Sequence, residues 1–364
     1  MPKLELVELS KNFGNIQALK DVSLQVDDKE YVCILGPSGC GKSTLIRCVA
    51  GIEQPSSGEI LIDGRSVEKT LIEDRQIGYV FQDIALFPHL TVQDNLAYGL
   101  TVRRTPSDQM RTVTNEMLDL INMRDRSKSY PKELSGGAQQ KVAVGRAIAT
   151  GAHLFLLDEP LGALDAIVRA ELRYELRKLA SDLGLTVIHV THDQEEALSI
   201  ADRIVIMKNG RIVEVGKPSE IYHYPRTLFT ANFVGEANLL EGKIVRVDGE
   251  RCTVDIAGHE FSASIVGKKV GRRAIVFVRP EFVHLTTPTE YGWKGKVKQV
   301  TFLGSLNRYV VETDDGIDII VEVSTAEYST GFGVDESVSL SLDDANMMTY
   351  DYPEEGVEKA ISLE

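Results

Sequence analysis

The chain has 364 residues, a formal net charge of −14 and a composition typical of soluble globular proteins. This length suffices for two domains with separate cores, and the acidic excess argues against a nucleic-acid-binding surface as the main function. Since no apolar run approaches the about 18 residues needed to span a bilayer, and the first residues show no signal-peptide pattern, we expect a cytosolic protein. Any role at a membrane is then expected to come through partner subunits.

Short apolar segments alternate with helix-length segments from Leu4 to about Val215, which predicts an α/β domain with a mainly parallel sheet. The expected strands are residues 4–9, 22–26, 31–35, 59–62, 77–81, 154–157, 186–190, 203–207 and 212–215. The expected helices are residues 43–50, 91–100, 107–123, 136–149, 166–181 and 194–201. The insertion at about residues 83–150 is mostly helical and is expected to form a helical subdomain.

The pattern changes after about Gly235 to short strands with frequent glycines and no long helix. An internal repeat occurs here, because GKIVRV at residues 242–247 recurs as GKVKQV at residues 295–300. Two related β units packed together predict one small barrel-like domain. We therefore expect a nucleotide-binding domain over residues 1–235 and an all-β domain with two related halves over residues 236–364.

A phosphate-binding loop is predicted at residues 36–43, where GPSGCGKS fits the pattern G-x-x-x-x-G-K-[ST] between a strand and a helix. Glycines let the backbone wrap closely around a phosphate chain, so that N–H groups and the helix N-terminus point at the negative charge. Lys42 is expected to reach the β- and γ-phosphates, and the Ser43 hydroxyl to ligate Mg²⁺.

Further polar segments follow strands or open helices later in the chain. LSGGAQ at residues 134–139 opens a helix, and LFLLDE at residues 154–159 is a buried strand that ends in two carboxylates, the expected place for a metal-facing Asp. LGALD spans residues 161–165, a strand ends at Thr191-His192-Asp193, and Gln82 follows the strand at residues 77–81.

In this order the segments resemble the ATP-binding-cassette (ABC) ATPases, over roughly residues 4–234. They are similar to the Walker A motif, Q-loop, signature, Walker B motif, D-loop and H-loop of that family. The resemblance implies an α/β P-loop NTPase fold, an ABC cassette with a helical subdomain, followed by an all-β domain of the OB or TOBE type. It also implies ATP and Mg²⁺ as cofactors.

The resemblance also assigns roles to single residues. Glu159 is the implied general base, assisted by His192 and Gln82, and the implied metal ligands are Ser43, Gln82 and Asp158. The implied nucleotide-binding residues are Phe13, Gly36, Pro37, Ser38, Gly39, Cys40, Gly41, Lys42, Ser43, Thr44, Ser135, Gly136, Gly137 and Asp165. His189 lies inside an apolar run and is expected to be structural.

In this family the signature binds ATP held by a second copy, which implies a two-fold dimer with two ATP molecules sandwiched between the subunits. Ala138 replaces the glutamine common after the second glycine, and Gly162-Ala163 replaces the commoner Ser-Asn of the D-loop. We expect weaker nucleotide discrimination at most from Ala138, because the phosphate-binding backbone is kept.

The segment at residues 82–92 is similar to the part of importer ATPases that docks a membrane subunit, although buried packing is an equal alternative for Leu86. Residues 278–281 (VRPE) and 302–312 (FLGSLNRYVVE) resemble the accessory β domain of maltose, polyamine and ferric-iron importer ATPases. The implied partners are a second copy, two transmembrane permease subunits and, indirectly, an extracytoplasmic solute-binding protein, with the chain peripheral on the cytoplasmic membrane face.

Polyamine or ferric iron, or another inorganic ion, is the favoured cargo. A sugar importer ATPase, a non-transport ABC ATPase acting on DNA or ribosomes, and a regulatory nucleotide switch are the alternatives. Only about a hundred residues separate the phosphate loop from the signature, and the chain carries one cassette; both features disfavour the DNA-repair and ribosome types.

Overall fold

The computed structural model describes residues 3–162, 164–267, 271–290, 292–326 and 331–363. It divides into two compact units, one ending at Pro218 and the other spanning Ser219–Leu363. The segment of short helices over residues 219–233 falls in the second unit by this division, whereas the expected domain boundary after residue 235 remains a prediction. No described helix combines the length and apolarity required to cross a membrane.

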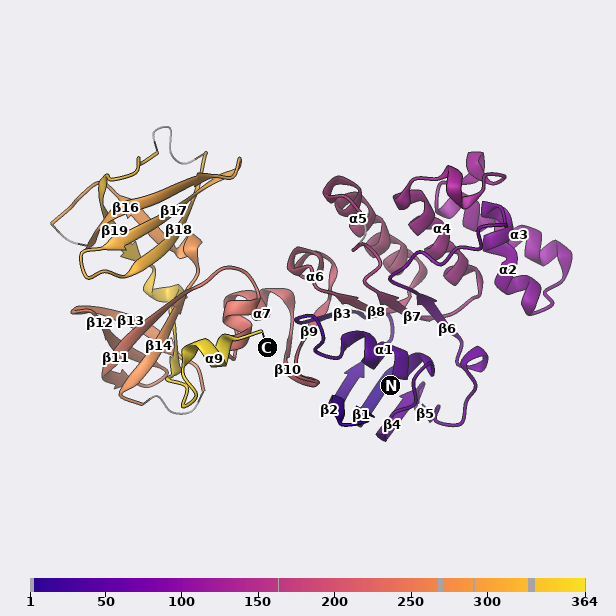
Figure 1. The fold of residues 1–364 in the computed structure, drawn as a ribbon, viewed down its shortest axis with the longest axis horizontal. Helices are drawn as coiled ribbons and strands as arrows, with labels where there is room; N and C mark the ends of the chain where they lie inside the picture. The colour runs from indigo at the N-terminus through magenta and orange to yellow at the C-terminus, as the bar shows by residue number, and fades with distance from the viewer. Residues whose placement is uncertain (1–2, 163, 268–270, 291, 327–330, 364) are drawn as a thin grey trace. The chain divides into compact units, whose positions relative to one another are not determined.

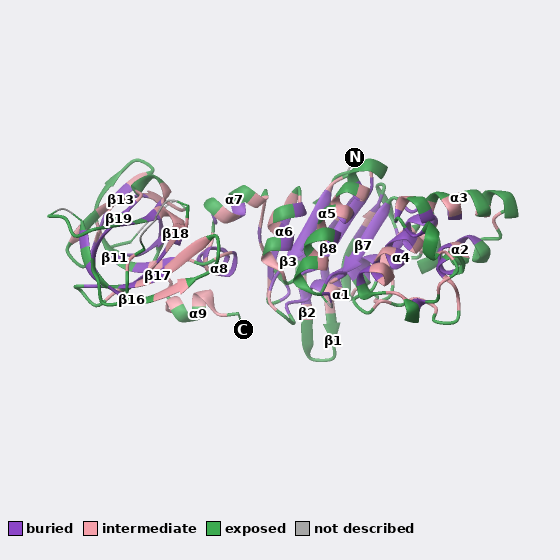
Figure 2. Ribbon diagram, turned by 90° about the horizontal axis from the view of Figure 1, so that it is seen from above, coloured by how far each residue is buried: buried purple, intermediate pink, exposed green. Residues whose placement is uncertain are grey.

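A six-stranded sheet in the order β10-β9-β3-β8-β7-β6 forms the centre of the first unit (Figure 1). Its strands are β3 (Tyr31–Leu35), β6 (Ile77–Val80), β7 (Leu154–Asp158), β8 (Thr186–Thr191), β9 (Arg203–Lys208) and β10 (Arg211–Gly216). All neighbours pair in parallel except β10, which is antiparallel to β9. Every residue of β3, β7 and β8 is buried (Figure 2), which explains their continuous apolar runs.

A second, antiparallel sheet in the order β2-β1-β4-β5 was not anticipated as a separate layer. It consists of β1 (Leu4–Phe13), β2 (Ile16–Val26), β4 (Ser57–Ile62) and β5 (Arg65–Ser66). The β1–β2 hairpin is longer than the expected strands. Its tip is largely solvent-exposed, so the residues there lack the apolar pattern from which strands are predicted. The parallel sheet therefore contains only part of the expected strands.

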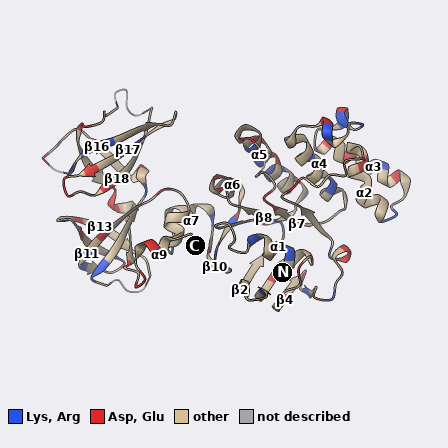
Figure 3. Cartoon of the chain, in the orientation of Figure 1, with Lys and Arg blue, Asp and Glu red and all other residues tan. Residues whose placement is uncertain are grey.

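The helices of the first unit begin and end close to their expected positions. They are α1 (Lys42–Ala50), α2 (Val92–Val102), α3 (Ser107–Leu120), α4 (Gly136–Ala149), α5 (Ala166–Leu183) and α6 (Gln194–Ile200). Short 3-10 turns are η1 (Ile72–Asp74), η2 (Arg124–Arg126) and η3 (Pro131–Glu133). Leu96 of α2, Leu118 of α3 and Val142 of α4 share a small core of their own. Both acidic and basic residues occur around α2 and α3 (Figure 3).

The second unit contains a closed barrel and a five-stranded sheet. The barrel is β11 (Asn238–Asp248), β12 (Arg251–Ile256), β13 (His259–Ile265), β20 (Met348–Asp351) and β14 (Arg273–Val278). The sheet is β15 (Val283–Thr286), β19 (Ser337–Leu342), β16 (Trp293–Phe302), β17 (Leu306–Thr313) and β18 (Asp318–Ser324). Helices and turns of this unit are α7 (Pro218–His223), α8 (Leu228–Phe233), η4 (Pro280–Phe282), η5 (Asp344–Asn346) and α9 (Val357–Ile361).

The internal repeat lies at corresponding places in these two assemblies. β11 pairs with β12 and β14, and β16 pairs with β17 and β19. Each copy of the repeat is therefore the first strand of an antiparallel meander, and its other edge pairs with a strand from later in the chain. Each copy begins with a glycine, Gly242 or Gly295, where a Cβ atom would come within 2.7 Å of a neighbouring strand. The chain also exchanges strands between the copies, because β15 joins the second assembly and β20 returns to the first.

Candidate functional site

The predicted phosphate-binding loop connects the buried strand β3 to helix α1. Gly41 caps α1 with φ 104°, a left-handed conformation that glycine adopts without strain. At Gly36 a Cβ atom would lie 2.3 Å from the carbonyl oxygen of Met207, so β9 packs directly against the loop. The loop shape therefore depends on glycine at both positions, and it leads into the N-terminus of α1, where the first N–H groups have no partner within the helix.

The Lys42 ammonium group is held within this loop. Its Nζ donates to the carbonyl oxygens of Gly36 at 2.7 Å and Pro37 at 2.9 Å, and the residue is 5% exposed. Cys40 is buried beside it, and burial raises the pKa of the Cys40 thiol. A protonated, buried thiol is a poor nucleophile, which favours a packing role for Cys40.

Asp158 ends β7 and is 1% exposed. Its Oδ1 accepts from the Ser43 hydroxyl at 2.8 Å, and its Oδ2 accepts from the Tyr79 hydroxyl at 3.1 Å. Arg47 Nη2 lies 3.7 Å from the same Oδ2 atom. Burial, followed by the neighbouring Asp158 charge, raises the pKa of Tyr79, so this phenol remains a proton donor to the carboxylate.

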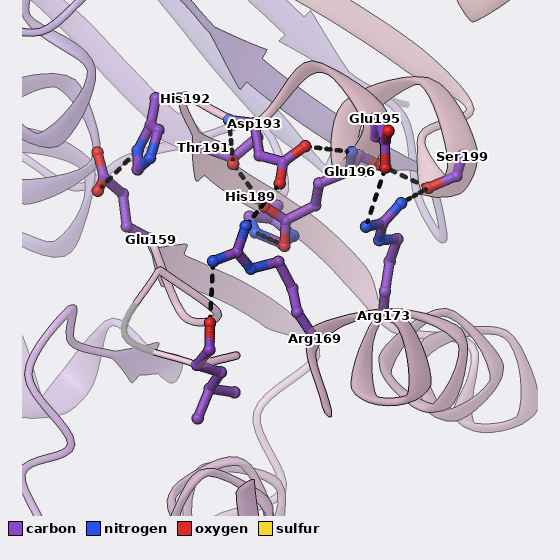
Figure 4. Close-up of polar contacts among 11 residues, drawn as sticks. Glu159, Arg169, Arg173, His189, Thr191, His192, Asp193, Glu195, Glu196 and Ser199 are labelled. Carbon is purple, nitrogen blue, oxygen red and sulfur yellow. Dashed lines mark hydrogen bonds and ion pairs between the residues drawn. The ribbon is translucent and has the colours of Figure 1, made fainter. Parts of the chain in front are cut away.

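Glu159 joins two predicted residues from different segments. His192 Nδ1 lies 3.1 Å from Glu159 Oε2 (Figure 4). Gln82 Nε2 donates to the same oxygen at 3.3 Å. The Glu159 backbone has φ 46°, unusual for a residue with a side chain, and its N–H donates to the Val190 carbonyl. The strand β8 thus fixes the turn from which Glu159 projects.

The signature residues lie elsewhere. Ser135 caps α4, its Oγ accepting from the Ala138 N–H at 3.3 Å, and both Ser135 and Gly136 are exposed. A Cβ at Gly137 would lie 2.7 Å from Val168 Cγ1, so this segment packs against the start of α5. Among the described residues, no hydrogen bond or ion pair joins Ser135, Gly136 or Gly137 to the phosphate-binding loop.

Two further predicted residues stand apart from the carboxylates. Asp165 caps α5, its Oδ1 accepting from the Val168 N–H at 3.1 Å. Phe13 ends β1, is 44% exposed, and has Lys11 Nζ 4.6 Å from its ring centre. Its exposed ring remains open to a planar ligand. Ala163 of the D-loop lies outside the described residues.

Sequence reasoning did not identify Tyr79 or Arg169 as parts of the site. Tyr79 pairs with Leu156 across the parallel strands β6 and β7, which brings its hydroxyl to the Asp158 carboxylate. A tyrosine within the strand that precedes Gln82 is the signal that would have found it. Arg169 contacts both the Leu164 carbonyl and Asp193, and the sequence offers no sign of this because three segments must meet in space.

His189 is buried, as expected for a structural histidine. Its Nδ1 lies 2.9 Å from the Tyr31 hydroxyl, and its Nε2 lies 3.2 Å from Glu196 Oε1. Burial acts to raise the pKa of Glu196, but the His189 contact and the hydrogen bonds from His189 and Thr191 outweigh it, so the pKa is lowered. This pair forms a buried polar support behind the strand that carries His192.

A cleft of about 450 Å³ lies between α4 and α5 and includes Gln140, Leu172 and Leu176 among its walls. It does not include the residues of the phosphate-binding loop. The loop residues Ser38 and Gly39 are instead exposed at the surface.

One strand separates β3 from β7 in the parallel sheet. This arrangement, with a glycine-rich loop before α1 and two carboxylates at the end of β7, defines a P-loop nucleoside triphosphatase. The ABC transporter family model matches residues 19–162, and the TOBE domain model matches residues 276–349. The chain belongs to the ABC transporter family and is an ATP-binding, ATP-hydrolysing subunit of the importer class.

Similar proteins cover most of the chain. The spermidine/putrescine import ATP-binding protein of Chromobacterium violaceum is 40% identical, over 87% of this chain and 90% of that protein. The sulfate/thiosulfate import ATP-binding protein of a Synechocystis species is 45% identical over 82% and 81%. The Fe(3+) ions import ATP-binding protein of Rhizobium etli is 41% identical over 86% and 88%.

The cassette also resembles solved structures. A dimeric ATP-binding cassette in a post-hydrolysis state with ADP and Pi matches with a TM-score of 0.53 and 33% identity, covering 59% of this chain and 98% of that one. The predicted ABC cassette fold and the TOBE-type domain are confirmed by these matches and by the barrel of the second unit.

Proposed function

We propose that two copies of this chain bind two ATP molecules at shared sites and, by hydrolysing them, drive a membrane permease that imports a small cationic or inorganic solute. The observation that supports this most strongly is the convergence of Gln82 and His192 on one oxygen of Glu159, beside an Asp158 bonded to the phosphate-loop Ser43.

Lys42 is proposed to transfer its hydrogen bonds from the Gly36 and Pro37 carbonyls to the β- and γ-phosphates of ATP, since phosphate oxygens are stronger acceptors for an ammonium group. Thr44 and residues 38–41 complete the phosphate cradle, and Phe13 stacks on adenine. Each of these roles acts on the nucleotide bound by the same chain.

Mg²⁺ fits the oxygens around Asp158. The Ser43 hydroxyl and the Asp158 carboxylate lie 2.8 Å apart, and the Gln82 amide contacts the adjacent Glu159; their oxygens are hard donors suited to this cation. No described group of three or more His, Cys, Asp or Glu side chains forms a metal cage, which suits a cation that shares its shell with phosphates and water. When bound, Mg²⁺ would neutralise charge on the phosphates.

Glu159 is the proposed general base, because its carboxylate is 18% exposed and can reach a water molecule at the edge of the loop. His192 holds that carboxylate and is placed to donate to the γ-phosphate, and Gln82 orients the carboxylate from the other side. Most of the rate acceleration then comes from positioning and from the positive charge of Lys42.

The second half of each site is proposed to come from the partner copy. Ser135 and Gly136 are exposed at the start of α4, where N–H groups and the helix dipole suit a phosphate, yet no contact among the described residues brings the phosphate-binding loop of the same chain to them. A two-fold dimer that places this helix over the partner's phosphate loop would complete two equivalent sites. Asp165 would then lie at the same subunit contact.

The permease is proposed to dock on an aromatic cleft of about 400 Å³ between β6 and the helices α2 and α4. Phe81 and Tyr98 are exposed there, and Phe87 lies 4.1 Å from Tyr98 between ring centres. Arg146 is largely buried, which lowers its pKa, and no described carboxylate pairs with it. Leu86 instead packs against the helical core, which favours the structural alternative for that residue.

Polyamine or an inorganic ion such as ferric iron is the proposed cargo, supported by the names of the relatives described above. The cargo itself would be selected by the permease and an extracytoplasmic binding protein, and the chain would act at the cytoplasmic face of the cell membrane.

The test is to isolate Glu159→Gln from its native cells with ATP and mild detergent and to identify co-purifying proteins by mass spectrometry. Glutamine keeps the size of Glu159 and its contacts but not its basicity, so this variant should bind ATP, dimerise and hydrolyse ATP very slowly. Two polytopic membrane proteins should be recovered, and their binding protein then defines the cargo.

Lys42→Ala treated in the same way is the matched control, because it should lose ATP-dependent recovery of partners. Near-normal turnover of Glu159→Gln contradicts the choice of base. Recovery of ribosomes, DNA-repair factors or no membrane protein contradicts the importer role but leaves the ATPase activity intact.

A further inference from the structure

Arg169, in the first turn of α5, connects two loops of the site (Figure 4). Its Nη1 lies 3.1 Å from Asp193 Oδ2, and its Nη2 donates to the Leu164 carbonyl at 2.9 Å. Leu164 directly precedes Asp165, and Asp193 directly follows His192. One guanidinium group therefore joins the loop predicted to face the partner subunit with the loop that carries His192.

The backbone on both sides of His192 is held by side chains. Asp193 Oδ1 accepts from the Glu196 N–H at 3.0 Å, and the Asp193 N–H donates to Thr191 Oγ1 at 3.0 Å. The Thr191 hydroxyl in turn donates to Glu196 Oε2. His192 itself is exposed, with 57% of its side chain accessible, so its ring has few packing contacts that could fix its position.

Glu196 is a fixed point for this arrangement. It is 3% exposed and lies 3.2 Å from Nε2 of His189, whose Nδ1 lies 2.9 Å from the Tyr31 hydroxyl. The Thr191 side of His192 is thus attached to the buried core of the unit. The Asp193 side is attached to the same core through Thr191 Oγ1 and the Glu196 N–H, and Arg169 additionally ties it to the Leu164 carbonyl of the other loop.

We infer that Arg169 is a positioning residue that sets His192 against Glu159 and ties that position to the Leu164–Asp165 loop. This inference rests on the proposed roles of His192 and Glu159. The guanidinium group binds the Leu164 carbonyl and the Asp193 carboxylate at the same time. A displacement of Leu164 is therefore transmitted to Asp193 and hence to the His192 backbone. His192 is then aligned for the reaction only when the loop next to Asp165 is in place.

Arg173 provides a matched comparison one turn further along α5. It also reaches α6, with Nη1 3.3 Å from Ser199 Oγ and Nη2 3.8 Å from Glu195 Oε2. Both arginines are substantially buried, with 29% of the Arg169 and 15% of the Arg173 side chain accessible. Arg173 touches neither neighbour of His192, so its loss should remove a similar amount of helix–helix contact without moving that residue.

The experiment compares Arg169→Met, Arg169→Lys and Arg173→Met in steady-state ATP hydrolysis by the full chain, with the thermal midpoint measured for each. Methionine keeps the apolar stem and removes both hydrogen bonds. We expect Arg169→Met to lower kcat about tenfold with KM for ATP within about twofold, Arg169→Lys to lie between, and Arg173→Met to remain near wild type.

A double variant separates positioning from structural damage. If Arg169 acts through His192, then Arg169→Met should cost nothing further in a His192→Ala background, and Asp193→Asn should match Arg169→Met without adding to it. An equal loss with and without His192, or unchanged kcat in a folded Arg169→Met, overturns the inference. If Arg169→Met does not fold, the same cycle with Arg169→Lys decides the question.

The proposed function is tested separately in the same series. If His192→Ala and Glu159→Gln both hydrolyse ATP normally, the assigned roles fail before Arg169 is considered. If both lose turnover while Arg169→Met does not, only the positioning role of Arg169 fails.

Discussion

Lys42 and Asp158 lie against groups of their own chain, whereas Ser135 and Gly136 lie exposed at the start of α4. The first pair is at most 5% exposed, and its partners lie in the phosphate-binding loop, in α1 and in β6. The signature packs instead on α5 through Gly137. In the proposed composite site, a single chain therefore prebuilds the half that would hold phosphate and would present the other half to a second molecule, because a composite site must leave one face uncovered.

The largest effect is expected from a substitution in the phosphate-binding half-site, which a single chain already forms. Lys42→Ala removes the only cationic group bonded to the loop carbonyls among the described residues, and should lower kcat/KM for ATP by at least about a hundredfold. Both ATP affinity, measured by titration calorimetry, and turnover should fall. Unchanged affinity would show that the backbone cradle alone holds the nucleotide.

Ser135→Arg should break the other half. The long side chain at the exposed N-terminus of α4 should lower turnover about a hundredfold while the isolated chain still binds ATP. Mixing this variant with Lys42→Ala is the sharper measurement, because each mixed dimer would regain one intact site. An equal mixture that exchanges freely should recover about a quarter of wild-type turnover. No recovery would contradict sites shared between copies.

The buried support of the prebuilt half should show in the pH dependence of stability. The pKa of Glu196 is lowered from its ordinary 4.5, so on acidification the unfolded chain takes up this proton before the folded chain does. The contribution of Glu196 is therefore complete above about pH 5 and is lost as pH falls through the folded-state pKa.

Glu196→Gln should accordingly cost about 1–3 kcal/mol in the free energy of unfolding at pH 7 and less at acidic pH. Urea titrations of both proteins across this range measure the difference. A pH-independent cost would mean that packing, and not the carboxylate charge, makes the contribution.

The smallest effect is expected for Ala138, the signature residue that differs from the one common in the family. Ala138→Gln restores the side chain common in the family, but the Ala138 contribution observed here is its backbone N–H, which donates to Ser135. Turnover with ATP should stay within about twofold of wild type, while the ratio of ATP to GTP turnover rises. A large gain in ATP turnover would show that Ala138 limits the site.

The sequence alone was sufficient to predict the elements that depend on residues adjacent in the chain. The phosphate loop follows from its glycines and Lys42, the buried strands β3, β7 and β8 from their continuous apolar runs, and the repeat from two copies of one glycine-led strand. Each of these rests on neighbours in the chain, so a one-dimensional pattern carries the information.

Tertiary structure alone decided the contacts between distant segments. The antiparallel layer of β1, β2 and β4, the Tyr79 hydroxyl on Asp158, and the strand exchange between β15 and β20 all depend on which strands become neighbours. Arg169 is the clearest case, because its two acceptors are a backbone carbonyl and a carboxylate 29 positions apart in the sequence (193 − 164). Neither residue type nor spacing marks such a contact, since packing of α5 against the loops creates it.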